Sequence, residues 1–228
     1  MKELPLEVVS FDAAGTLIRL AEPVGSIYAK VARDHGLIVD PGTLGRAFGK
    51  VWKRTPPAFS AVVHVDEPDE RAWWSRLVGE VFVEANAIFA DDRAFGDFFD
   101  DLYRRFEEPG TWLLEDSATE VVARVANRYR CVILSNFDGR LRRILGDLGL
   151  LAPFETLFLS CEERLSKPDP RLFRRVSETL GVAPASILHV GDDPVCDWAG
   201  AEAAGFRHFR VGHGQAALFE LLEELSLA

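Results

Sequence analysis

The chain has 228 residues, 48% of them hydrophobic and 27% charged, which is typical of a globular protein and unlike a disordered one. Its net charge of −10 argues against a basic nucleic-acid-binding surface, and its apolar runs are far shorter than the roughly 18 residues that span a membrane. Three cysteines without CxxC spacing, and an N-terminal segment unlike a signal peptide, favour a cytoplasmic protein, which we expect to be a monomer or a homodimer.

The N-terminal half begins with one predicted strand and continues with helices. Val8–Phe11 is a short apolar run typical of a buried strand. Between about residues 20 and 114 the apolar residues instead recur at helical spacing, in Val24–His35, Gly42–Lys53, Asp69–Ala87 and Arg93–Phe106. These segments predict an α-helical cap domain, residues 20–114, inserted after the first strand.

The C-terminal half alternates between strands and helices. Short apolar runs predict strands at Cys131–Leu134, Thr156–Leu159, Ile187–Val190 and Arg207–Val211. Amphipathic segments predict helices at Ala118–Ala126, Leu141–Leu148, Pro170–Leu180, Trp198–Ala204 and Gln215–Leu225. This alternation indicates βαβ units. The predicted fold class is therefore α/β, with a Rossmann-like doubly wound parallel sheet built from residues 1–19 and 115–228 and carrying the inserted helical cap.

Polar residues follow four of the predicted strands, where a doubly wound sheet binds its ligands. They are Asp12 after the first strand, Ser135 and Asn136 after the second, Lys167 after the third, and Asp192, Asp193 and Asp197 after the fourth. Lysine is scarce in this chain, and Lys167 is the one lysine of the C-terminal half. We expect these side chains to surround one site.

This set of residues suits phosphoryl transfer. An aspartate such as Asp12 can attack phosphorus and form an acyl phosphate. The phosphate dianion repels a carboxylate, so positive charge is required, and Lys167 with a Mg²⁺ ion bound by carboxylates would supply it. Ser135 and backbone amides would hold the phosphate oxygens. Gly15 and Thr16 would let the loop after Asp12 fold back toward the ligand.

The segments FDAAGTL, LSN, SKPDP and HVGDDPVCD resemble, in this order, the four motifs of the haloacid dehalogenase-like (HAD) hydrolase superfamily. The resemblance implies a hydrolase acting on a small phosphorylated metabolite. It implies that Asp12 is the nucleophile, Lys167 the catalytic cation, and Thr16, Ser135 and Asn136 the substrate contacts. It also implies that Asp12, the Ala14 carbonyl and Asp192 bind Mg²⁺, and that Asp193 and Asp197 orient these ligands without binding the metal. For Asp193, capping a helix is the favoured interpretation.

The predicted cap narrows the resemblance to one subgroup. It contains EPVGSIYAKVARDHGL, AFGKVWKR and RAWWSRLVGEVF, which resemble the capped subfamily I proteins named after a rhythmically expressed insect gene. This subgroup implies a hydrolase without naming its substrate. The pair Trp73-Trp74 is expected to lie in the core of the cap.

Ala14 departs from the superfamily pattern. Most phosphatases that resemble this chain have an aspartate there, which protonates the leaving group, and losing that help costs about 10²–10⁴ in rate. Superfamily members without this acid include dehalogenases, whose halide leaves as an anion, and phosphonate hydrolases that use a cap lysine, for which Lys50 and Lys53 are weak candidates. Dehalogenases do not need the acidic cluster, and they favour tyrosine where this chain has Phe173.

Three functions stay open from the sequence. The favoured one is a phosphatase acting on phosphate esters whose leaving groups depart without a proton donor. The second is a catalytically quiet binding protein, and the third is a 2-haloacid dehalogenase. His189 is predicted to be structural, with a role as the missing acid as its alternative. Asp138 is predicted to cap the next helix.

Overall fold

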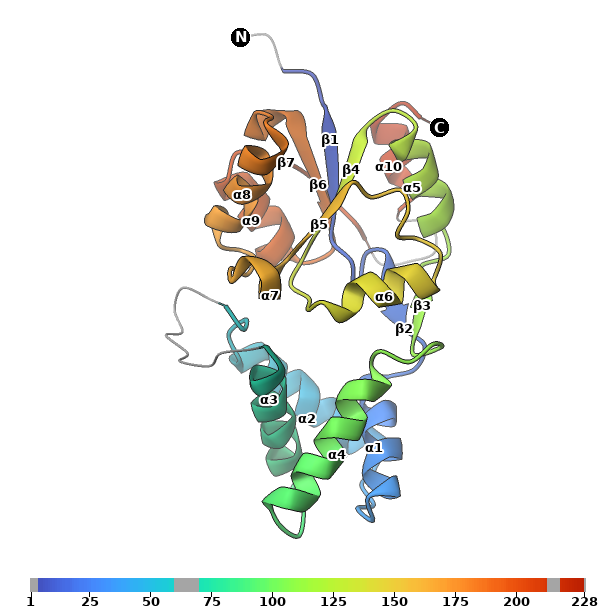
Figure 1. Ribbon diagram of the computed structural model, residues 1–228, viewed down its shortest axis with the longest axis vertical. Helices are drawn as coiled ribbons and strands as arrows, with labels where there is room; N and C mark the ends of the chain where they lie inside the picture. The colour runs from blue at the N-terminus through green and yellow to red at the C-terminus, as the bar shows by residue number, and fades with distance from the viewer. Residues whose placement is uncertain (1–3, 60–69, 213–217, 228) are drawn as a thin grey trace. The chain divides into compact units, whose positions relative to one another are not determined.

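The computed structural model describes residues 4–59, 70–212 and 218–227. These residues form two compact units (Figure 1). Residues 4–19, 59, 113–212 and 218–227 form an α/β core unit, and residues 20–58 and 70–112 form a helical unit. None of the helices in the described ranges is long and apolar enough to cross a membrane.

The core unit is built on a five-stranded sheet in the order β5-β4-β1-β6-β7, and each neighbouring pair is parallel. The strands are β1 (Val8–Phe11), β4 (Arg130–Ser135), β5 (Thr156–Leu159), β6 (Ile187–Gly191) and β7 (Arg207–Arg210). All four residues of central β1 are buried, as expected of a parallel strand covered on both faces. The predicted Rossmann-like doubly wound sheet is confirmed, because the chain builds outward from β1 in one direction and then in the other.

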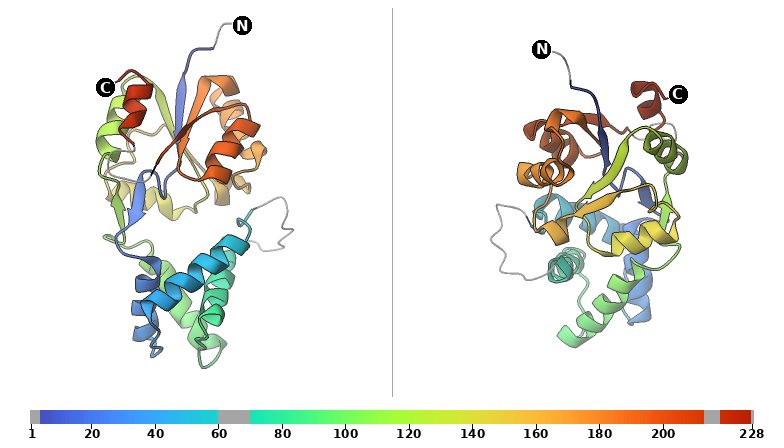
Figure 2. Two further views of the ribbon diagram at one scale, coloured as in Figure 1. Left: turned by 180° about the vertical axis from the view of Figure 1, so that it is seen from behind. Right: turned by 45° about the horizontal axis from the view of Figure 1, so that its top comes forward.

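Helices cover both faces of this sheet, with α5 and α10 on one side and α8 and α9 on the other (Figures 1 and 2). The helices are α5 (Ala118–Ala126), α6 (Arg140–Asp147), α7 (Ser160–Glu163), α8 (Pro170–Leu180), α9 (Gly200–Ala203) and α10 (Glu220–Glu224). Local sequence explains both ends of α8: the Asp169 side chain caps the N-terminus ahead of Pro170, and Gly181 ends the helix in the left-handed conformation.

The helical unit contains α1 (Val24–Asp34), α2 (Pro41–Arg54), α3 (Glu70–Glu84) and α4 (Asp92–Arg105). Asp40 and Asp91 cap α2 and α4 by accepting hydrogen bonds from Thr43 N and Ala94 N. Its core is rich in aromatic rings, and Tyr28 stacks on Phe82 with ring centroids 6.3 Å apart. Trp73 is buried in this core, as predicted, whereas Trp74 is half-buried.

Several elements differ from the sequence prediction. Two short strands, β2 (Ile18–Leu20) and β3 (Trp112–Leu114), pair with each other and were not predicted. The helix expected at Trp198–Ala204 begins earlier, as a π-helical turn over Pro194–Ala199, and a 3₁₀ turn spans Pro184–Ser186. The first residues of the helix predicted at Gln215–Leu225 lie outside the described residues; α10 accounts for part of the remainder.

Candidate functional site

The carboxyl ends of β1 and β4 and the loop before α8 bring three predicted residues into contact. Asp12 follows β1 directly, and Ser135 is the last residue of β4. The Ser135 hydroxyl donates to Asp12 Oδ1 at 2.9 Å, and Lys167 Nζ donates to the same oxygen at 2.7 Å. Asp12 is 7% exposed and Lys167 only 2%. A carboxylate and an ammonium buried together at a strand end form the centre of the site.

Asn136 holds the backbone of Lys167. Its side-chain oxygen accepts from Lys167 N at 2.7 Å, and its side-chain nitrogen donates to Lys167 O at 2.9 Å. We expected Asn136 to contact the substrate. In the structure its amide fixes the loop that carries Lys167, which sets where the ammonium lies, and its contact with a substrate stays a prediction.

Asp197 holds the other end of Lys167. Its Oδ1 accepts from Lys167 Nζ at 2.5 Å and lies 3.0 Å from His189 Nε2, while its Oδ2 accepts from Asp193 N at 2.9 Å. The π-helical turn places Asp197 here, and such turns are frequent at functional sites. Asp193 itself caps this turn by accepting from Val195 N and Cys196 N.

Asp192 lies against the loop that follows Asp12. Thr16 Oγ1 donates to Asp192 Oδ1 at 3.2 Å, so the Thr16 side chain contacts this carboxylate rather than pointing only toward a ligand. Gly15 has φ +95°, and a Cβ atom there would lie 2.6 Å from Asp192 Oδ2. Both the conformation and the close approach require glycine. Ala14, the third predicted metal contact, is half-buried in the same loop.

The carboxylates of Asp12, Asp192 and Asp197 each offer an oxygen within 4.8 Å of the others. Hard oxygen donors at this spacing fit a divalent cation such as Mg²⁺. Both oxygens of Asp197 already accept hydrogen bonds from protein groups. Asp12 and Asp192 are therefore the better candidates for ligands.

The electrostatics of this cluster indicate a shortage of positive charge. Burial, opposed by Lys167, raises the pKa of Asp12 to about 6, and burial together with Asp197 raises the pKa of Asp192. Burial disfavours the charged form of Lys167, but Asp12 and Asp197 outweigh it and raise its pKa. Burial also opposes ionisation of Asp197, yet Lys167 and His189 lower its pKa. The positive charge of Lys167 thus offsets the negative charge of Asp197. A cation bound by Asp12 and Asp192 would offset the remaining negative charge of the cluster.

The stability of the metal-free protein is expected to fall as Asp12 ionises. Its pKa rises from an ordinary 3.8 to about 6 in the folded state, so the folded protein keeps this proton to higher pH than the unfolded chain. The stability that it contributes is complete below about pH 4 and is lost as the pH rises through about 6. The shift corresponds to a change on the order of 3 kcal/mol.

Urea unfolding in EDTA measures this change, with Asp12→Asn as the reference because asparagine cannot ionise. Between about pH 4 and pH 7 the unfolding free energy of the wild type should fall relative to the variant. A difference that stays constant over this range would contradict the prediction.

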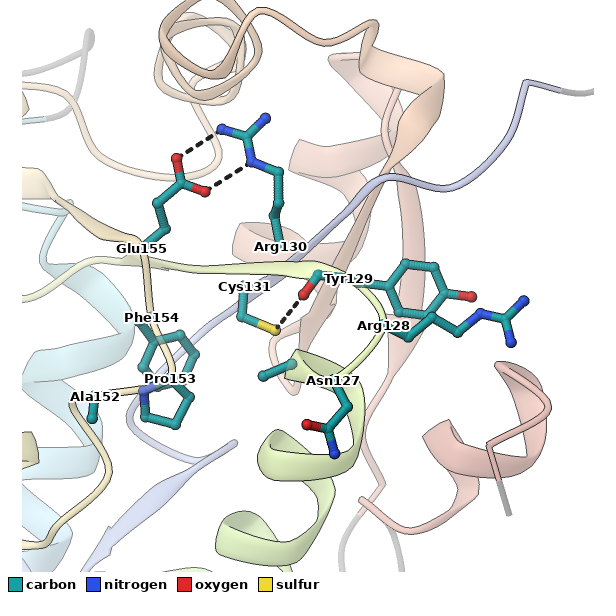
Figure 3. A pocket seen from close by; sticks show the side chains of 10 residues that line it. Asn127, Arg128, Tyr129, Arg130, Cys131, Ala152, Pro153, Phe154 and Glu155 are labelled. Atoms are coloured by element: carbon teal, nitrogen blue, oxygen red, sulfur yellow. Dashed lines mark hydrogen bonds and ion pairs between the residues drawn. The ribbon is translucent and has the colours of Figure 1, made fainter.

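A pocket lies at the amino ends of strands β4 and β5, opposite the carboxyl ends that carry the site (Figure 3). Its lining residues are 126–131 and 152–155. Arg130 is engaged by Glu155 through two hydrogen bonds of 2.8 Å, and burial raises the pKa of the Cys131 thiol to about 12. These groups offer no activated nucleophile, and the pocket contains none of the predicted site residues.

The sequence analysis does not single out Ser10, and it predicts a structural role for His189 with general acid as the alternative. Ser10 Oγ lies 2.9 Å from His189 Nδ1, and His189 in turn reaches Asp197. A sequence signal existed, because each is a polar residue inside an apolar run that predicts a buried strand. Phe173, where related dehalogenases favour tyrosine, is fully buried and packs edge-on against the His189 ring.

Comparisons with known proteins agree with this fold. The family model of haloacid dehalogenase-like hydrolases matches residues 6–205. Haloacid dehalogenase-like hydrolase domain-containing protein 3 of Homo sapiens is 34% identical over 214 residues, which cover 93% of this chain and 84% of the human protein. The chain belongs to the haloacid dehalogenase-like hydrolase family.

Its place within the family is also indicated. The rhythmically expressed gene 2 protein of Drosophila melanogaster is 24% identical over 210 residues, 87% of this chain and 80% of that protein. The predicted resemblance to this subgroup is thereby confirmed. Among solved structures, the putative HAD-hydrolase YfnB from Bacillus subtilis, bound to magnesium, has a similar fold, with a TM-score of 0.72 at 18% identity over 98% of this chain and all of that one.

Proposed function

We propose that this hydrolase is a Mg²⁺-dependent phosphatase that cleaves a small phosphorylated metabolite through an aspartyl-phosphate intermediate on Asp12. One observation carries the proposal: a nucleophilic carboxylate, a buried ammonium and a second carboxylate meet at one sheet edge. Lys167 Nζ lies 2.7 Å from Asp12 Oδ1, and Asp192 offers an oxygen within 4.8 Å of Asp12. A phosphate dianion can approach a carboxylate only where positive charge offsets their repulsion.

Asp12, Lys167 and Ser135 would each have a distinct role in the reaction. Lys167 and Ser135 both donate to Asp12 Oδ1, so Oδ2 is the candidate attacking atom. It would form a bond to phosphorus while the ester oxygen departs with the bonding electron pair. Water would then attack the acyl phosphate, release phosphate and restore the carboxylate. Lys167 and Ser135 would donate to phosphoryl oxygens throughout.

A bound Mg²⁺ would be held by Asp12, Asp192 and the Ala14 carbonyl, and would supply charge neutralisation for the phosphoryl group. The raised pKa values of Asp12 and Asp192, caused mainly by burial, support a cation at this position. Thr16 and Gly15 support it as well, because both bring the loop after Asp12 against Asp192.

Dehalogenation is the second candidate, and Ala14 favours it because a halide needs no proton to leave. Against it stands Asp192, a carboxylate that an ester-forming dehalogenation does not use. The phosphonate route is weaker still. Lys50, one of its two candidate lysines, is exposed and forms an ion pair with Glu84 at 3.0 Å inside the helical unit.

Phosphate release is expected to depend on Mg²⁺ and on Asp192. A panel of phosphate esters should release phosphate with Mg²⁺ and not in EDTA. Asp192→Asn should raise the Mg²⁺ concentration for half-maximal rate by at least the roughly 10–100-fold that outer partners of a metal site contribute. Asp193→Asn is the matched control, since asparagine keeps the oxygen that caps the next turn.

Two results would count against the phosphatase. Undiminished phosphate release in EDTA would remove the role of the metal. Chloride release from 2-chloropropionate in EDTA, without phosphate release from any ester, would favour dehalogenation instead.

A further inference from the structure

Two polar residues lie side by side in the middle of the core sheet. Ser10 on β1 and His189 on β6 are register partners, and both are completely buried. A buried polar group is costly unless it is hydrogen-bonded. Here Ser10 Oγ lies 2.9 Å from His189 Nδ1, and Asp197 Oδ1 lies 3.0 Å from His189 Nε2. Both ring nitrogens therefore have partners, and one of these partners is the carboxylate that holds Lys167.

The partners determine where the imidazole carries its proton. An ionised carboxylate only accepts hydrogen bonds, so Nε2 must carry the proton and donate to Asp197. Nδ1 then accepts from the Ser10 hydroxyl. Burial lowers the pKa of His189 although Asp197 opposes this effect, which favours the neutral ring. The Phe173 ring lies edge-on to the imidazole at 90°, with centroids 5.4 Å apart, and limits its rotation.

We propose that His189 is a positioning residue, whose neutral imidazole donates Nε2–H to Asp197 and thereby orients the carboxylate that places Lys167 against Asp12. The inference rests on the proposed function of Lys167 and Asp12. His189 is not the missing acid, because it has no exposed surface and its Nε2 proton is directed at Asp197. A continuous series of hydrogen bonds connects Ser10 through His189, Asp197 and Lys167 to Asp12.

Two amide variants separate the hydrogen bond to Asp197 from the packing of the ring. The amide of glutamine reaches about as far as the histidine Nε2, whereas the amide of asparagine reaches only to Nδ1. His189→Gln can donate to Asp197, and His189→Asn can contact Ser10 but not Asp197. Both lose the ring that packs on Phe173. His208→Asn is the control for loss of a histidine, since His208 is the half-exposed register partner on β7.

We expect His189→Asn to lower kcat for p-nitrophenyl phosphate by about 10–100-fold with a smaller change in KM, as loss of an outer partner does. Its affinity for vanadate should fall as well, because Lys167 is then misplaced. His189→Gln should restore most of both quantities, and His208→Asn should leave both unchanged. Equal losses in the Gln and Asn variants, in step with their thermal stabilities, would show a packing role and overturn the inference.

A measurement without turnover distinguishes this inference from the proposed function. Imidazole ¹⁵N spectra of the wild type should show His189 neutral with its proton on Nε2, and Asp197→Asn should shift the Nε2 signal. If no ester is hydrolysed but these spectra are found, the proposed function is wrong. The hydrogen bond by which His189 positions Asp197 would still be supported. A proton on Nδ1, or a charged ring, overturns the inference whatever the turnover.

Discussion

Asp12→Asn is expected to abolish hydrolysis, lowering kcat by about 10⁴-fold or more, as removal of a covalent nucleophile does in other hydrolases. The amide is a poor nucleophile, and it also removes the negative charge that Lys167 contacts at 2.7 Å. Steady-state rates with p-nitrophenyl phosphate and Mg²⁺ measure the loss. In the wild type, mass spectrometry of acid-quenched protein should find a phosphoryl group on Asp12.

A second variant, Asp12→Glu, tests whether the position of the carboxylate matters. It keeps the carboxylate but moves it by one methylene, away from the position that Ser135 and Lys167 define at 2.9 and 2.7 Å. Because misplacement by about 1 Å can cost 10²-fold in rate, Asp12→Glu should also be strongly impaired. Activity retained in Asp12→Asn, with the protein shown to be folded, would place the nucleophile elsewhere and end the proposed mechanism.

Ala14→Asp is expected to raise the turnover of alkyl phosphates by up to the roughly 10²–10⁴ that general acid catalysis supplies. In the wild type an unprotonated oxygen must leave, so rates should depend steeply on leaving-group pKa. Nitrophenyl phosphate should be cleaved far faster than alkyl phosphates. The Asp side chain would provide the proton, and its benefit should be small for nitrophenolate, which leaves readily without one.

The loop around Ala14 is held by its own backbone, which favours a defined position for the new side chain. Ala13 O accepts from Leu17 N at 2.8 Å and from Ile18 N at 3.0 Å, and Gly15 N donates to Ile18 O at 2.8 Å. Ala14→Asn is the matched control, nearly the same shape without the acidic proton. Adding Asp12→Asn to Ala14→Asp should abolish the gain, because acid and nucleophile are separate groups.

Two outcomes would contradict this account of Ala14. Equal wild-type rates on nitrophenyl and alkyl phosphates would show that another group donates the proton. An equal gain from Ala14→Asn and Ala14→Asp would show that the effect comes from a change in the loop and not from general acid catalysis.

Much of the core could be predicted because its signals are local. Apolar runs such as Thr156–Leu159 form strands at the predicted residues, and helices such as Pro170–Leu180 carry their own caps and stops. Residues that follow parallel strands must gather at one sheet edge, which is why Asp12, Ser135 and Lys167 could be expected together. The strands β2 and β3 could not be predicted, since each is three residues long and its partner is distant in the sequence; next to them, Glu115 N donates to Leu17 O.

The sequence by itself determined where the core strands lie along the chain, their buried character, and which polar side chains stand at their carboxyl ends, because these depend on residue type and spacing along the chain. Only the tertiary structure decided which of these side chains contact each other. Asn136 holds Lys167, Thr16 contacts Asp192, and His189 reaches Asp197. The pairing of Ser10 with His189 depends on the register of β1 and β6, which are separated by more than 170 residues. Such register is set by packing across the whole sheet, and no local pattern encodes it.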